Sequence, residues 1–86
     1  MKLKCNFVIN NVAGETVAVT VGNSDFNGYI KLNETGTFIF KMLKNDTTRE
    51  DIIKALMKEY PEATHEAAVE SVDELLQKLD KAELLV

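Results

Sequence analysis

The pattern of apolar residues changes its period at Asn33, and this change constrains the fold more than any other feature of the chain. In the segment 28–32, Ile30 and Leu32 alternate with residues of the opposite face, and a period of two is typical of a β-strand. After Asn33, apolar residues recur at helical spacing: Phe38, Ile39, Met42 and Leu43. The Asn33 side chain can cap that helix by accepting a hydrogen bond from a free amide of its first turn. We therefore expect sheet before this residue and helix after it.

Two further strands are predicted upstream of this junction. Valines alternate with smaller or polar residues in 17–21, and 7–9 is a short apolar run. The segment 10–15 between them is rich in Asn and Gly, which tolerate positive φ, so it can close a hairpin. The segment 22–28 is rich in turn-forming residues and predicts a loop, with Phe26 folded back onto the core.

Three segments after Asn33 have apolar residues at helical spacing: about 34–43, a segment that ends at Pro61, and about 65–81. The second follows overlapping capping boxes, with Thr47 or Thr48 as the cap, and Thr64 caps the third. The chain therefore predicts an α+β fold of winged helix-turn-helix type. In this fold a three-stranded antiparallel sheet is followed by three helices (βββααα).

Length and composition indicate one small cytoplasmic domain. The chain has 86 residues, of which 45% are hydrophobic, enough for a single domain over residues 1–86 with a modest core. No apolar run approaches the ~20 residues of a membrane span, and the start of the chain lacks the long apolar segment of a signal peptide. The single cysteine, Cys5, cannot form an internal disulfide, which fits a reducing compartment.

Charge is distributed unevenly along the chain. The net charge of −4 divides into +1 for residues 1–47 and −5 for residues 48–86. The third predicted helix and its end, 66–83, hold six acidic residues and two lysines. This counts against binding of a phosphate backbone, whose affinity comes mainly from Lys and Arg. A DNA-binding winged-helix regulator is the alternative function, because the fold alone permits it.

No set of residues with the chemistry of an active site is evident. The only histidine, His65, lies between Glu62 and Glu66 at a predicted helix start, where a solvated surface position is expected. Cys5 has no candidate base, and one Cys with one His are too few ligands for a structural zinc site. The chain also lacks a Gly-rich phosphate loop. We therefore expect a protein that is not an enzyme and that has no metal or cofactor.

A free sheet edge is the candidate binding feature. Three strands leave two edges with unpaired backbone groups. If the third strand is open, its backbone can accept a guest peptide as an added strand at four residues: Tyr29, Ile30, Lys31 and Leu32. The third helix would form the other wall, with apolar pockets and polar rims from four residues: Val69, Asp73, Leu76 and Asp80. Two alternatives stay open, namely a blunted edge without a ligand and a homodimer through two open edges.

The block Leu-Asn-Glu-Thr-Gly at 32–36, followed by spaced apolar residues, resembles the PqqD family. The spaced residues extend the resemblance over roughly 5–86: Phe38, Ile39, Phe40, Leu43, Ile52, Leu56, Tyr60, Val72, Leu75, Leu76, Leu79, Leu84 and Leu85. It implies a small winged-helix domain, a RiPP recognition element, that binds the leader segment of a ribosomally made precursor peptide. It also implies strand addition at the third strand beside the third helix, and presentation of the peptide to a modifying enzyme, often a radical SAM protein.

Four positions depart from the pattern of the family. Phe40 stands where tryptophan is common, and Ser71 replaces an acidic residue. Asn45-Asp46 replaces an acidic-Gly turn, and Ala82-Glu83 precedes the final leucines where a glycine is frequent. The resemblance is therefore to the wider family, and it leaves the precursor peptide unidentified.

Overall fold

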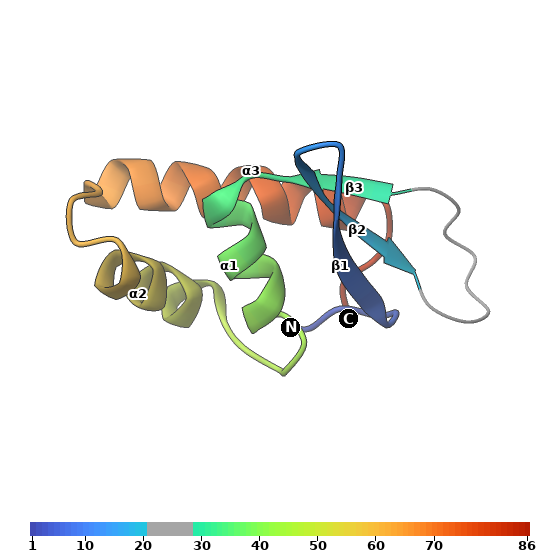
Figure 1. Cartoon of the computed structure of the whole chain (residues 1–86). Coiled ribbons are helices and arrows are strands. Elements are labelled where there is room, and N and C mark those ends of the chain that lie inside the picture. Colours follow the sequence, from blue (N-terminus) through green and yellow to red (C-terminus); the bar gives the residue numbers. More distant parts are fainter. Residues whose placement is uncertain (21–28) are drawn as a thin grey trace.

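Three strands followed by three helices make up the fold, which the computed structural model describes for residues 1–20 and 29–86 (Figure 1). The elements are β1 (Phe7–Val12), β2 (Glu15–Thr20), β3 (Tyr29–Leu32), α1 (Glu34–Met42), α2 (Arg49–Glu59) and α3 (His65–Lys81). This order confirms the predicted βββααα arrangement. The positions expected for Val21, Phe26 and Gly28 lie outside the described residues.

The sheet is antiparallel, and β2 lies between β1 and β3. The register places Ile9 opposite Ala18 and Ala18 opposite Ile30. These residues share the face that packs on the helices, where Ala18 is fully buried. The opposite face leaves three large apolar side chains exposed to solvent: Val8, Val12 and Tyr29.

The turn between β1 and β2 is shorter than the segment 10–15 predicted for it. β1 continues to Val12 and β2 begins at Glu15, so only Ala13 and Gly14 form the turn. Both residues have positive φ, 50° and 82°, as a two-residue type I′ hairpin turn requires. Because this turn matches the twist of the flanking strands, the two asparagines before it extend β1 instead of forming the loop.

Each helix begins after a residue whose side-chain oxygen accepts a hydrogen bond from an amide of the first turn. The three pairs are Asn33 with Gly36 at 2.7 Å, Thr48 with Asp51 at 3.2 Å, and Thr64 with Ala67 at 3.1 Å. These caps agree with the prediction and decide between Thr47 and Thr48, because the side-chain oxygen that accepts the Asp51 amide belongs to Thr48. No helix among the described residues has the length and apolar character needed to cross a membrane.

The core lies between the sheet and the helices. Phe7 of β1 and Phe40 of α1 meet edge to face with ring centroids 5.1 Å apart, and Phe40 is fully buried. The other large side chains with almost no exposure come from the helices and from the end of α1: Ile39, Leu43, Ile52, Leu56, Val72 and Leu79. Because α1 is packed directly on the sheet in this way, β3, which leads into α1, is held in place with it.

The two ends of the chain lie next to each other below the sheet (Figure 1). Leu3 and Leu85 form an antiparallel bridge, and Leu84 is buried in the core. The Leu3 amide also donates to the carbonyl of Leu43 at 2.8 Å, at the end of α1. This small ladder lies away from the outer edge of β3.

Candidate functional site

The outer edge of β3 is the first part of the candidate site. β3 pairs with β2 along one edge, and no other described segment pairs with the second edge. In an antiparallel sheet alternate residues direct their N–H and C=O groups to each side, so about half of the β3 residues present both groups to that edge. The prediction that the third strand is an edge strand is confirmed for the described residues.

The side chains of β3 alternate between the two faces of the sheet. Leu32 is buried and Ile30 is half-buried, and both belong to or pack against the core. Tyr29 is exposed on the other face, as is Lys31, whose Nζ lies 3.3 Å from Oε1 of Glu15 on β2. Among the described residues, the strand therefore has one edge without a pairing strand while its inward side chains stay in the core.

A depression of about 320 Å³ lies between β3, the start of α1, and α3. β3 and the start of α1 contribute Lys31, Leu32, Asn33, Thr35 and Gly36. α3 contributes Ser71, Glu74, Leu75 and Lys78. Leu32 and Leu75 are both buried, so their side chains form a floor that exposes little apolar surface. The walls are polar, and α3 forms one of them. That this wall contacts a peptide stays a prediction.

The residues predicted on that wall lie elsewhere, and their predicted position beside β3 is wrong. Successive helical residues turn by about 100°, so Asp73 lies about 200° from Ser71. Val69, Leu76 and Asp80 share the side of Asp73, and none of the four lines the depression. Val69 and Leu76 are half-buried against the core, and Asp80 is exposed. Whether any of the four contacts a ligand stays a prediction.

The side of α3 that carries Asp73 faces α2. Nε and Nη2 of Arg49, the first residue of α2, donate to the two carboxylate oxygens of Asp73 at 2.7 and 3.0 Å. These hydrogen bonds lower the pKa of Asp73 below its usual value of 3.8, against the opposing effect of burial. The same pair raises the pKa of Arg49. Asp73 therefore ties the two helices together on the side away from the depression.

Sequence periodicity could not distinguish the two borders of the apolar stripe of α3. The stripe is centred on Val72, with Ser71 about 100° to one side and Asp73 about 100° to the other. Each border carries small or charged residues, so both are suited to a partly solvated wall. Only the packing of α3 between β3 and α2 decides which border faces the strand. Ser71, Glu74 and Lys78 were missed for this reason.

The junction from β3 into α1 forms one end of the depression. Oδ1 of Asn33 accepts hydrogen bonds from the Gly36 amide at 2.7 Å and from the Thr35 hydroxyl at 3.1 Å. A Cβ added to Gly36 would lie 2.9 Å from that oxygen, closer than such atoms normally approach, and 3.6 Å from Cδ2 of Leu32. Glycine at position 36 therefore gives the capping side chain the room that it occupies.

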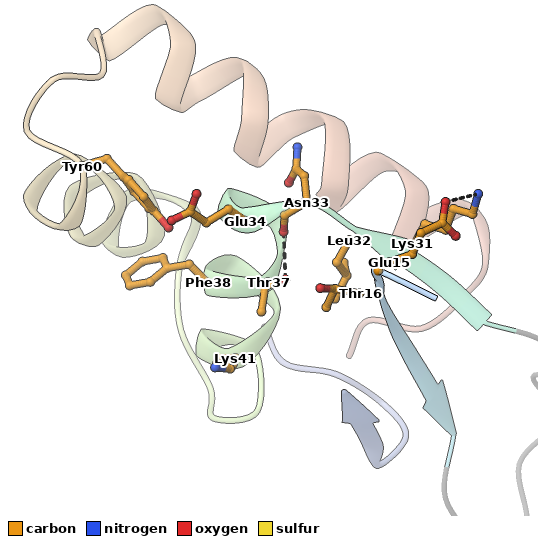
Figure 2. Close-up of a pocket in the computed structure, with 11 residues that line it drawn as sticks. Glu15, Thr16, Lys31, Leu32, Asn33, Glu34, Thr37, Phe38, Lys41 and Tyr60 are labelled. Carbon is orange, nitrogen blue, oxygen red and sulfur yellow. Dashed lines mark hydrogen bonds and ion pairs between the residues drawn. The ribbon is translucent and has the colours of Figure 1, made fainter. Parts of the chain in front are cut away.

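A second, larger depression of about 660 Å³ lies on the other side of this junction (Figure 2). It extends from the hairpin turn at Gly14 to the exposed side of α1 and to Tyr60. Phe38 and Tyr60 meet there edge to face with centroids 6.1 Å apart. Burial raises the pKa of Tyr60, and the negative charges of the nearby Glu34 and Glu59 raise it further. The described lining includes neither Cys nor His.

Metal-binding geometry is likewise not found in the part of the chain that the structure describes. No group of three or more His, Cys, Asp or Glu side chains there is placed to hold a metal ion. His65 is exposed at the start of α3, and Cys5 is half-buried near the N-terminus.

A family model described as Coenzyme PQQ synthesis protein D (PqqD) matches residues 8–85. The chain belongs to the PqqD family. The resemblance drawn from the block at 32–36 and the spaced apolar residues is thereby confirmed, and residues 32–36 of this PqqD-family chain border both depressions.

A solved structure with the same fold is described as "TbiB1 in Complex with the TbiA(beta) Leader Peptide". Its TM-score is 0.72 at 24% sequence identity, and the match covers 99% of this PqqD-family chain and 94% of TbiB1. At this identity the likeness shows a common fold. The comparison with curated proteins gives no match.

Proposed function

We propose that residues 1–86 act as one domain that binds the leader segment of a ribosomally synthesised precursor peptide. The leader adds a strand to the open edge of β3, beside α3, and the domain presents it to a modifying enzyme. The observation that carries this proposal is the open edge of β3 next to a depression whose second wall is α3. Membership of the PqqD family supports it, as does the common fold with TbiB1, whose structure contains a leader peptide.

In strand addition, the backbone and the side chains of the guest peptide would make different contacts. Its backbone would pair with the free N–H and C=O groups of residues 29–32, which gives affinity without regard to sequence. Alternate side chains would point into the depression over Leu32 and Leu75, and the others would lie beside Tyr29 and Lys31. Because the floor exposes little apolar surface and a flexible leader must be ordered, we expect a Kd in the micromolar range.

The role is proposed to be non-catalytic, so the chemistry belongs to a partner. The resemblance to the family leads us to expect a radical SAM protein as that partner, acting on a bound leader in the cytoplasm. An adaptor of this kind needs an accessible binding edge, a requirement that the open edge of β3 meets.

Titration of the ¹⁵N-labelled protein with the leader of a precursor encoded beside its gene tests the proposal directly. We expect shifts in the amides of Tyr29–Leu32 and along residues 71–78 of α3. Shifts confined to the larger depression around Phe38 and Tyr60 would overturn strand addition at β3. The DNA-binding alternative predicts neither pattern.

Two variants of α3 test whether the leader binds in the depression or elsewhere along the helix. Ser71→Arg places a long side chain in the depression from a half-buried position and should weaken leader binding at least about tenfold. Gln77→Arg adds the same charge at an exposed position outside it and should leave binding almost unchanged. Thermal unfolding of both variants checks that the fold is kept. Equal binding by the two variants would show that the leader does not enter the depression.

A further inference from the structure

Two opposite charges on the α3 wall of the depression lie outside every ion pair found among the described residues. Glu74 and Lys78 are exposed, and neither forms an ion pair with another described residue. The third charged residue that lines the depression, Lys31, is 3.3 Å from Glu15 on the outer face of the sheet. An incoming peptide would therefore meet one free negative and one free positive charge, in fixed order along α3.

The spacing of these charges matches that of an extended peptide. Four residues of an α-helix advance about 6 Å, and two residues of a β-strand advance about 6.7 Å. Side chains two positions apart on a strand point to the same side. Two alternate side chains of a strand added to β3 can thus lie opposite Glu74 and Lys78 in turn.

The direction of the guest decides which charge it meets first. β3 and α3 run in opposite directions (Figure 1), so Lys78 lies towards the Tyr29 end of β3 and Ser71 towards Asn33. Every strand pair of this sheet is antiparallel, and antiparallel pairing is slightly more stable per residue than parallel pairing. A guest antiparallel to β3 runs along α3 in the same direction as α3 and passes Glu74 before Lys78.

We propose that the recognised leader segment carries a basic residue followed two positions later by an acidic residue, and that Glu74 and Lys78 read this order. This inference rests on the proposed function and adds the chemical character of the peptide to it. The pair sets the register and direction of the guest, because the reverse order, or a shift by two residues, places like charges opposite each other.

A displayed library of random twelve-residue peptides, selected on the full chain, tests the inference. The unchanged protein should enrich Lys or Arg followed two positions later by Asp or Glu. The double variant Glu74→Lys with Lys78→Glu, which keeps the net charge, should enrich the opposite order. One enriched peptide and its charge-reversed counterpart should differ about tenfold in affinity for the unchanged protein, with the preference inverted for the variant and reduced at high salt.

A second double variant supplies the matched control. Glu50→Lys with Lys54→Glu exchanges an acidic and a basic residue at the same spacing on α2, where both are exposed and outside both depressions. It should keep the preference of the unchanged protein.

The experiment distinguishes failure of this inference from failure of the proposed function. Enriched peptides that lack the charge order, show the opposite order, or keep their preference after the Glu74 and Lys78 exchange would overturn the inference and leave the proposed function standing. If no peptide is enriched and no added peptide shifts the amides of residues 29–32, both fail.

Discussion

At the scale of single residues, the entry into α1 depends on a tight contact between Asn33 and Gly36. Oδ1 of Asn33 caps the helix, and a methyl group on Gly36 would lie 2.9 Å from that oxygen. Asn33→Ala should cost about 1 kcal/mol through loss of the cap. Gly36→Ala should stabilise that variant by up to about 1 kcal/mol through its higher helix propensity. In the unchanged protein the same methyl group displaces the cap, and this gain is lost.

Urea unfolding of the four proteins measures this coupling. We expect the effects of the two substitutions to differ from additivity by about 1 kcal/mol, in the direction that favours the double variant. Asn33→Asp with Gly36 unchanged keeps a capping oxygen and serves as the control. Additivity within about 0.3 kcal/mol would mean that Gly36 is not there to make room for the cap.

A second residue-scale prediction concerns acid stability and the ion pair between Arg49 and Asp73. The pKa of Asp73 is lower in the folded protein than its usual 3.8, so the unfolded state binds the proton more readily. The contribution of the pair is complete above that value and is lost as the pH falls through the folded pKa. Asp73→Asn should therefore lower stability at pH 7, and the difference from the unchanged protein should shrink and vanish as the pH falls through the folded pKa of Asp73.

Denaturant unfolding at several pH values from 7 downwards checks this sign. Asp80→Asn, on the same helix but outside any ion pair among the described residues, is the matched control and should have a smaller effect at pH 7. A difference for Asp73→Asn that grows on acidification would contradict the assignment.

Residue-scale features were the easiest to predict from sequence, because a helix cap involves only the three or four residues that follow it. Asn33, Thr48 and Thr64 all accept the expected amide hydrogen bonds. The choice between Thr47 and Thr48 was open in the sequence. In the structure Oγ1 of Thr48 accepts the Asp51 amide, while the Thr47 amide donates to the carbonyl of the distant Met1.

At the scale of elements, α3 ends in a Schellman motif that has an unsuitable residue at its turn. The Leu84 amide donates to the backbone carbonyl of Leu79 at 2.9 Å, and the Glu83 amide donates to the backbone carbonyl of Asp80 at 3.0 Å. Glu83 has a φ of 58°, a conformation that glycine adopts without strain. Because a side chain strains this backbone conformation, glycine is the residue best suited to position 83. Glu83→Gly should stabilise the protein by about 1 kcal/mol.

The neighbouring residue provides a test of that explanation. Ala82 has a φ of −84°, so Ala82→Gly relieves no strain and should lower stability. Chemical denaturation of both variants compares them. A loss of stability in both would mean that the Glu83 side chain contributes more than its backbone conformation costs.

Element order could be predicted from sequence, whereas the face of α3 that meets β3 could not. Periodicity located helices and strands because it follows from the geometry of each element alone. The side of α3 next to β3 depends on how three helices pack around Val72, and its two borders look alike in sequence. The hairpin was predicted too long for a related reason, since asparagines suit both a turn and the exposed side of a strand.

At the scale of the whole molecule, the charge distribution separates peptide binding from DNA binding. The acidic charge is concentrated after residue 47, and α3, the helix beside the candidate site, carries much of it. We expect no salt-dependent binding to duplex DNA, because a helix of this charge repels the phosphate backbone. Fluorescence anisotropy with a labelled duplex at low salt measures this. Binding that weakens steeply as salt is added would revive the winged-helix regulator.

The open edge of β3 also allows two copies of the chain to pair, and this possibility can be separated from leader binding. A symmetric dimer through β3 would use the backbone groups that the leader needs. Because β3 has only four residues, we expect such a dimer to be weak and to dissociate when leader is added. Sedimentation velocity over a range of concentrations, with and without leader, measures both effects.

In Ser71→Arg the depression is filled while the edge stays open, so any dimer should persist when leader is present. A dimer of the unchanged protein that survives saturating leader would place the contact elsewhere, and the outer face of the sheet offers the exposed apolar residues for it: Val8, Val12 and Tyr29.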